Sequence, residues 1–96
     1  MTRYAKRKDG NHNEIQRALS SVTVVDDISW IGRGFGDLMA EHIKTRKIVF
    51  IEIKDPSQKK SARKLTESEK EFHLRWNNHV KVVETVEQAY RAIGVI

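Results

Sequence analysis

The sequence predicts an α/β fold in which a small mixed β-sheet is flanked by helices, in the order αβββαβα. Helix-start signals followed by apolar stripes at helical spacing occur once near the beginning of the chain and twice in its second half. Four predicted strands lie between and around these helices, and three of them are rich in β-branched residues. With 96 residues the chain has room for one domain, which we expect to span residues 1–96.

Each predicted helix begins at a capping box, in which a side-chain oxygen and a Glu or Gln three residues later satisfy exposed backbone amides. The boxes are Thr66-x-x-Glu69, Thr85-x-x-Gln88 and, more weakly, Asn11-x-x-Glu14. The first helix is expected from about His12 to Ser20. The apolar stripes of the three helices, in chain order, are Ile15, Ala18 and Leu19; Leu65, Phe72 and Trp76; and Val86, Ala89, Tyr90 and Ile93.

The predicted strands are Val22 to Asp26, Asp37 to His42, Lys47 to Lys54 and Val80 to Glu84. A glycine-rich bend at Gly32, Gly34 and Gly36 separates the first strand from the second. Pro56, the only proline, ends the third strand.

The composition indicates a polyanionic partner, because 18 Lys and Arg outnumber 13 Asp and Glu. Nucleic acid is the first candidate and an anionic membrane the second. A basic stretch at 44–64 follows an acidic one at 18–43, which suggests a basic rim around carboxylates. The absence of cysteine excludes disulfides, thiolate nucleophiles and Fe–S clusters, so any metal is held by oxygen or nitrogen.

The sequence shows no targeting or membrane-spanning segment. The basic start, Met1 to Lys8, is followed by Asp9-Gly10-Asn11 instead of an apolar stretch, and the longest aliphatic or aromatic run is Ile48 to Ile51. We therefore expect an intracellular, cytoplasmic protein, or one in the host cytoplasm if it is encoded by a phage.

The strand from Lys47 to Lys54 carries the candidate chemistry. Strand periodicity places Ile48, Phe50, Glu52 and Lys54 on one face. A hairpin turning at Lys44-Thr45 sets Asp37 directly opposite Glu52. Two facing carboxylates repel each other unless a cation lies between them, and ligation by carboxylates alone favours Mg²⁺. Lys54 is then placed to touch a metal-bound water or a phosphoryl oxygen.

Three segments resemble the VRR-NUC branch of the PD-(D/E)xK nuclease superfamily: Gly34-Phe35-Gly36-Asp37-Leu38, Glu52-Ile53-Lys54, and Leu65-Thr66-x-x-Glu69-x-x-Phe72. The chain departs from the branch at Gly36, where proline is frequent. The resemblance implies a restriction-endonuclease-like fold. It also implies Asp37, Glu52 and the Ile53 carbonyl as metal ligands, Lys54 as catalytic lysine, Glu14 as accessory acid, and Mg²⁺, with Mn²⁺ as a substitute, as cofactor for phosphodiester hydrolysis.

Several residues also have a simpler interpretation. Glu14 is explained by its capping box alone. The basic residues Lys59, Lys60, Arg63 and Lys64 form either a solvated loop or a DNA-backbone contact. Trp30, Phe35 and Trp76 can stack on bases, although Trp76 fits the core better. The histidines His12, His42, His73 and His79 have no metal-ligand spacing, so we expect them at the surface or in hydrogen bonds.

The function expected from these features is a Mg²⁺-dependent endodeoxyribonuclease, similar to stand-alone, phage-type Holliday-junction resolvases and acting on branched DNA. The alternatives are a general nickase, a flap nuclease, or a basic nucleic-acid-binding module without catalysis. Two nicks in a junction require two copies, so we expect a homodimer. The residues expected at its interface, because they exceed the needs of one small core, are Ile15, Leu19, Trp30, Ile31 and Phe35. The alternative is that all of them fill the core of the monomer.

Overall fold

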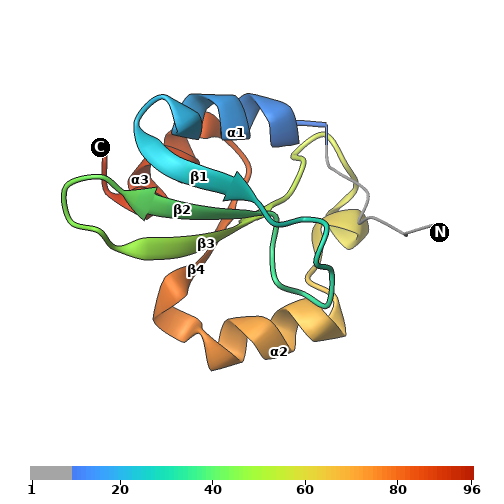
Figure 1. The fold of residues 1–96 in the computed structure, drawn as a ribbon. Helices are drawn as coiled ribbons and strands as arrows, with labels where there is room; N and C mark the ends of the chain where they lie inside the picture. Colours follow the sequence, from blue (N-terminus) through green and yellow to red (C-terminus); the bar gives the residue numbers. More distant parts are fainter. Residues whose placement is uncertain (1–9) are drawn as a thin grey trace, which may run out of the picture.

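A computed structural model of the protein describes residues 10–96, except for the side chains of Ala62 and Asn78. The basic segment from Met1 to Lys8 lies outside this part. Within the described residues, α-helices and strands follow one another in the predicted order αβββαβα (Figure 1). The protein is therefore a small mixed α/β structure.

The elements begin and end close to their predicted positions. The α-helices are α1 (His12–Ser20), α2 (Glu67–Arg75) and α3 (Val86–Ile93). The strands are β1 (Thr23–Asp27), β2 (Leu38–His42), β3 (Ile48–Ile53) and β4 (Val80–Val83). Two short 3₁₀ turns, η1 (Lys60–Arg63) and η2 (Asn77–His79), precede and follow α2. Among residues 10–96, no helix is long and apolar enough to cross a membrane.

The strands form one sheet in the order β1-β2-β3-β4. The β1, β2 and β3 strands are antiparallel neighbours, whereas β4 lies parallel to β3. A parallel neighbour needs a crossover connection, and α2 supplies it. Helices α1 and α3 pack together and against one face of the sheet, while α2 lies on the opposite side (Figure 1).

The main hydrophobic core lies between the sheet and the pair α1 and α3. The β3 strand contributes Val49, Ile51 and Ile53, as its period predicts. Ile15 and Leu19 of α1 are fully buried in this core, so their predicted place in a dimer interface is wrong. Their spacing of four residues puts both on the same side of α1, which the sheet covers.

The start of α1 differs from the predicted capping box. Asn11 is the N-cap residue, but its side chain makes no capping hydrogen bond. Instead its Nδ2 donates to the carbonyl oxygens of Lys54, at 3.1 Å, and Glu84, at 2.8 Å. The side chain thus ties α1 to the chain just beyond β3 and β4, and a tertiary contact has replaced the expected local one.

The other two helices begin where predicted, although only α2 has the complete capping box. At α2 both halves of the box are present, between Thr66 and Glu69. At α3 the Thr85 hydroxyl accepts from the Gln88 backbone N–H, whereas the Gln88 side chain accepts from the backbone N–H of Glu84. Local sequence therefore determines where these two helices begin.

Candidate functional site

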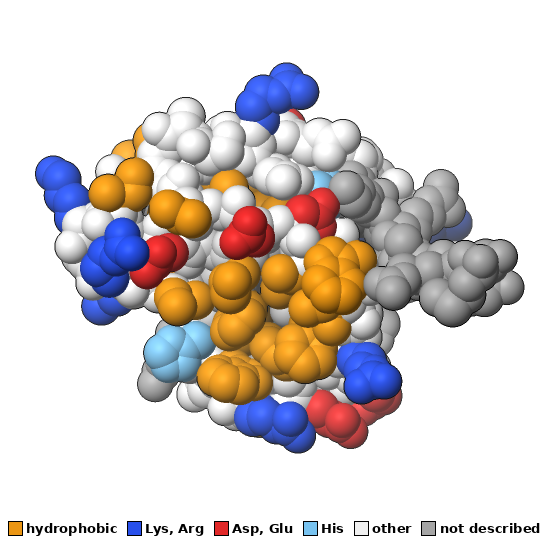
Figure 2. Space-filling model, in the orientation of Figure 1, with side chains coloured by type: hydrophobic (Ala, Val, Ile, Leu, Met, Phe, Trp, Pro, Cys, Tyr) orange, Lys and Arg blue, Asp and Glu red, His pale blue; other side chains and the backbone are white. Residues whose placement is uncertain are grey.

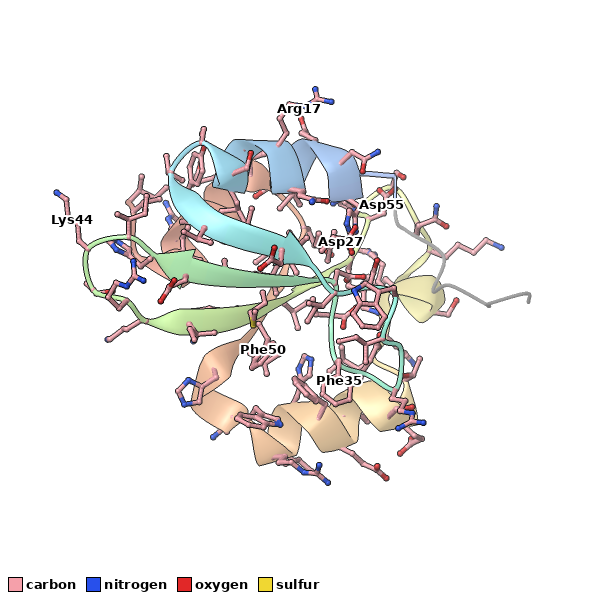
Figure 3. All side chains as sticks on the ribbon, viewed as in Figure 1. Arg17, Asp27, Phe35, Lys44, Phe50 and Asp55 are labelled. Carbon is pink, nitrogen blue, oxygen red and sulfur yellow. The ribbon has the colours of Figure 1, made fainter. Side chains whose placement is uncertain are left out.

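The face of β3 that is turned toward α2 carries the polar residues of the candidate site. Glu52 is fully buried and Lys54 is 8% exposed, although both are charged residues. Phe50, on the same face, meets Phe72 edge-on at a ring separation of 5.3 Å. Figure 3 shows Phe35 and Phe50 directed into the space between the sheet and α2. The charged pair therefore lies at the end of an aromatic layer that α2 completes.

The predicted register of the hairpin is confirmed. Leu38 pairs with Ile51, and Glu41 with Ile48. Asp37 lies one residue before β2 and is 3% exposed. Its backbone N–H donates to the Ile51 carbonyl, and its Oδ2 accepts from the Ile53 backbone N–H, both at 2.8 Å. Asp37 is thus bonded to the two residues that flank Glu52, which places both carboxylates at the same end of the sheet.

The glycine-rich bend brings Asp37 to this position. Gly34 has φ +79°, and a Cβ there would lie 2.3 Å from the Ser68 carbonyl oxygen. The bend therefore packs directly on the first turn of α2. Gly36 has φ +93°, whereas a proline ring holds φ near −65°. The backbone before Asp37 consequently takes a shape that the proline frequent in the VRR-NUC branch could not adopt.

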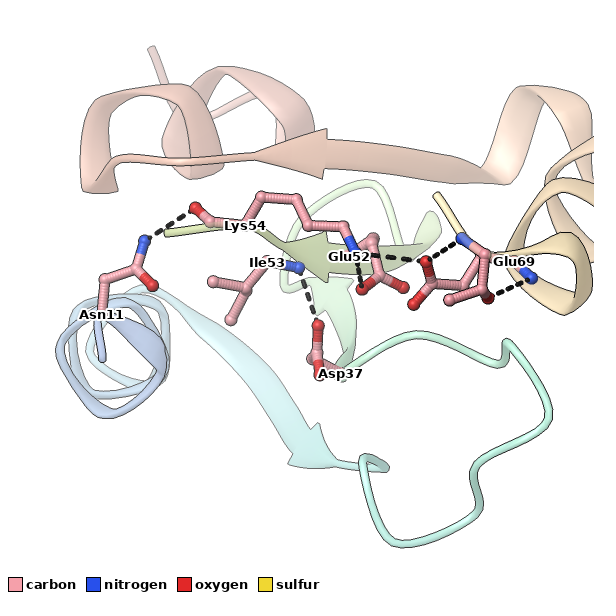
Figure 4. A network of polar contacts seen from close by, with 7 residues as sticks. Asn11, Asp37, Glu52, Ile53, Lys54 and Glu69 are labelled. Atoms are coloured by element: carbon pink, nitrogen blue, oxygen red, sulfur yellow. Dashed lines mark hydrogen bonds and ion pairs between the residues drawn. The ribbon is translucent and has the colours of Figure 1, made fainter. Parts of the chain in front are cut away.

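Lys54 lies between two carboxylates from different elements (Figure 4). Its Nζ is 3.1 Å from Glu69 Oε1 and 3.6 Å from Glu52 Oε2. Glu69 is 3% exposed, and its side chain also accepts from the Thr66 backbone N–H at 2.8 Å. In the sequence, Glu69 stands in a capping box and in a segment that resembles the VRR-NUC branch, and neither assigns it a role beside Lys54. A buried lysine requires a nearby counter-charge, but sequence spacing alone did not reveal that α2 supplies one.

Glu14 is not placed with these residues. The α1 helix buries His12, Ile15 and Leu19, and Glu14 lies on its exposed side. His12, which is 1% exposed, is the polar residue that α1 directs inward, and its Nε2 lies 3.2 Å from Asp27 Oδ2. The expectation that His12 is hydrogen-bonded is confirmed. The predicted accessory acid instead faces solvent, and Asn11 does not form the capping box with it.

The four predicted DNA-contact residues differ in their surroundings. Lys59, Lys60 and Lys64 are exposed. Arg63 is partly buried, and its guanidinium forms an ion pair with Glu84 at 2.9 Å. The three lysines are therefore available for a polyanion, whereas Arg63 joins η1 to the segment after β4.

Asp55 follows Lys54 directly and is ionised at neutral pH. Hydrogen bonds from the side chain and backbone of Ser57, with a smaller contribution from the Gly10 backbone, lower its pKa, and partial desolvation opposes them. The carboxylate thereby fixes the turn at which the chain leaves the candidate site.

The donor set of the site suits a hard divalent cation. Residues 10–96 contain no group of three or more His, Cys, Asp or Glu side chains that could hold a metal ion. Asp37 and Glu52 offer two carboxylates, and the backbone carbonyl of Ile53, the residue between Glu52 and Lys54 in the sequence, would be a further oxygen. Mg²⁺ commonly binds through one or two carboxylates and retains several waters, so this set fits Mg²⁺ better than zinc.

Comparisons with known proteins do not assign the chain to a class: no family model matches it, and neither curated proteins nor solved structures gave a match.

Proposed function

We propose that this protein is a Mg²⁺-dependent endodeoxyribonuclease with a restriction-endonuclease-like fold, a single domain that hydrolyses phosphodiester bonds. One observation carries the proposal: Asp37, Glu52 and Lys54 are buried together where β2 and β3 meet the bend. Burying two carboxylates and an ammonium in a small domain costs stability, and such groups are frequent at functional sites. The mixed sheet and the order αβββαβα are compatible with the proposed fold.

Each residue has a distinct role in this proposal. Asp37 and Glu52, with the Ile53 carbonyl, would hold Mg²⁺ or Mn²⁺. The bound cation would supply a nucleophilic hydroxide and offset negative charge on the phosphoryl group. Lys54 would donate a hydrogen bond to the attacking water or to a phosphoryl oxygen, where negative charge develops. The exposed Lys59, Lys60 and Lys64 would contact the DNA backbone, together with Arg63 if its bond to Glu84 is released.

We also propose branched DNA as substrate and a homodimer as the active form, because a four-way junction is resolved by two symmetric nicks. Trp30 is 56% exposed, so it can take part in an interface or stack on a base. Phe35 has less freedom, since its ring lies 4.9 Å from that of Phe72. A nickase or flap nuclease would need only one copy.

A cleavage panel tests the proposed function. Four-way junction, flap, fork, duplex and single-stranded DNA are incubated with Mg²⁺, Mn²⁺ or EDTA. We expect metal-dependent cleavage with the junction preferred. Asp37→Asn and Glu52→Gln should abolish cleavage but retain DNA binding in Ca²⁺, because each removes a metal ligand and keeps its shape. Glu14→Gln, on the exposed side of α1, is the matched control and should cut normally.

The outcomes separate the alternatives. DNA binding that is equally strong in EDTA and in Mg²⁺, with no cleavage in either, would favour the non-catalytic module. Sedimentation equilibrium should give a mass near twice 11.1 kDa, and a cruciform plasmid should be linearised by paired cuts. A strict monomer that releases only nicked circles would favour the nickase over the resolvase.

A further inference from the structure

The pairing of Lys54 raises a question about metal binding at the candidate site. Its ammonium lies 3.6 Å from Glu52, one of the proposed ligands. The side chains of Lys54, Glu52 and Glu69 are each at least nine-tenths buried. An ammonium paired with a carboxylate in such a place competes with any cation for the same oxygens. A lysine that neutralised Glu52 would therefore weaken the metal site.

Glu69 competes with Glu52 for the Lys54 ammonium. The shorter of the two contacts of Lys54 Nζ, 3.1 Å, is to Glu69 Oε1. The same oxygen accepts from the Thr66 backbone N–H, while the Glu69 backbone N–H donates to Thr66 Oγ1 at 3.2 Å. The capping box thus fixes the carboxylate at the start of α2 (Figure 4).

The position of α2 is fixed in turn by the bend. At Gly34, a Cβ would lie 2.3 Å from the Ser68 carbonyl oxygen and 2.7 Å from the Glu69 backbone nitrogen. The segment that leads to Asp37 therefore rests on the same helical turn that supplies Glu69. One local arrangement sets both a proposed ligand and the counter-charge of the lysine.

We propose that Glu69 is a positioning residue that holds the Lys54 ammonium and thereby limits its competition with a divalent cation for the Glu52 carboxylate. This inference rests on the proposed function. Without the charge of Glu69, Glu52 becomes the main counter-charge for Lys54, and a cation must compete with it. Metal affinity should fall although neither metal ligand has changed.

Mn²⁺ binding, measured by electron paramagnetic resonance and calorimetry without DNA, tests the inference. Glu69→Gln removes the charge but retains an oxygen that can accept from Thr66, since Gln also serves at this position of a capping box. We expect the Kd for Mn²⁺ to rise by about tenfold, which corresponds to about 1.4 kcal/mol. Cleavage should require a correspondingly higher metal concentration.

Two further variants separate charge from folding. Thr66→Ala weakens the capping box but keeps the Glu69 charge, so it should lower the melting temperature and leave the Kd within about twofold. In a Lys54→Met background, Glu69→Gln should no longer raise the Kd, because the ammonium that it controls is absent. This second comparison is a double-mutant cycle on the proposed pair.

Failure of the inference differs from failure of the proposed function. An unchanged Kd in folded Glu69→Gln, with an active wild type, overturns the role of Glu69 alone. If Glu69→Gln does not fold, the Lys54→Met variant decides. A Kd for Mn²⁺ within about threefold of the wild-type value supports the inference. Mn²⁺ binding that is about tenfold tighter than in the wild type shows that Lys54 already blocks Glu52, and it overturns the inference. A wild type that neither binds Mn²⁺ nor cuts DNA overturns both.

Discussion

The two faces of the sheet are built in opposite ways, although β3 contributes to both. Toward α1 and α3, β3 presents Val49, Ile51 and Ile53, and the surrounding core is largely apolar. Toward α2 it presents Phe50 and Glu52, with Lys54 directly after the strand. Figure 2 shows hydrophobic side chains gathered between the strands and α2, open to solvent. The first face is therefore stabilised by apolar burial, whereas the second holds polar groups whose burial costs stability.

Because of this contrast, the effect expected of a mutation, on folding or on chemistry, depends on the face of the sheet where it lies. A closed apolar layer gains free energy from every buried methylene. The layer under α2 combines aromatic rings with a buried ion network, in which one missing partner leaves another charge uncompensated. Mutations on the face toward α1 and α3 should therefore affect mainly the free energy of unfolding, whereas mutations on the face toward α2 should affect mainly cleavage.

Lys54→Ala should give the largest effect. Loss of an electrostatic or general acid group lowers cleavage by roughly 10²- to 10⁴-fold, with metal affinity less affected. Lys54→Arg should rescue little, because a planar guanidinium replaces a compact ammonium in a buried place. Single-turnover cleavage measures both, and Lys44→Ala, in the exposed turn between β2 and β3, is the control. Full activity in Lys54→Ala would show that the charge of Lys54 has only a structural role.

Ile51→Ala should give the largest loss of stability, because Ile51 is fully buried in the core against α1 and α3. Removing its side chain costs about 2 to 5 kcal/mol in the free energy of unfolding. Ile48→Ala removes the same atoms from the same strand, but Ile48 is 45% exposed on the α2 face, so the cost should be about 0.5 kcal/mol. Urea unfolding compares the two. Equal losses would contradict the contrast between the faces.

Gly34→Ala should disturb the α2 face selectively. Gly34 and Gly32 both have positive φ, +79° and +71°, so alanine at either position costs about 1 kcal/mol in backbone strain. Only at Gly34 does the added methyl meet the backbone of α2, whereas nothing lies within 4 Å at Gly32. Gly34→Ala should therefore lose more stability and most activity. Similar behaviour of the two variants would show that the contact with Ser68 can relax.

The basic loop should contribute to DNA affinity through its exposed lysines. Replacing Lys59, Lys60 or Lys64 by Ala should flatten the slope of log K against log salt by about one unit per phosphate contact. Arg63→Ala should instead lower stability, because Arg63 holds Glu84 at 2.9 Å. Fluorescence anisotropy at several salt concentrations measures the slope. No change in the triple lysine variant would place the DNA surface elsewhere.

Asp55→Asn should have the smallest effect and should reveal itself in the pH dependence of stability. The pKa of Asp55 in the folded protein lies below its ordinary value of 3.8. Its ionised form therefore stabilises the fold above that value, and the contribution disappears as pH falls from 3.8 through the lowered folded pKa. Unfolding at about pH 6 and about pH 3 compares wild type and variant. The difference should shrink at the lower pH, and Ser57→Ala should reproduce part of it.

Local rules were sufficient for much of the structure. Alternation along β3 and the turn after His42 fixed the hairpin register, so the approach of Asp37 to Glu52 followed from residues 37–54 alone. The start of α2 at Thr66 followed in the same way from a capping box of four residues. Such signals can be read from sequence because both partners lie within one hairpin or one helical turn.

The remaining features depend on contacts between distant segments. Asn11 looked like a helix cap, yet its amide binds carbonyls 43 and 73 residues away. Glu14 matched an accessory acid, but packing of Ile15 and Leu19 turned it outward. The proximity of Glu69 to Lys54 arises only when α2 crosses the sheet. The sequence by itself determined the order of elements, the register and the Asp37 and Glu52 pair, since these depend on short-range geometry. Only the tertiary structure decided which side chains complete the network, because burial of whole helix faces outweighs the preference of any single polar residue.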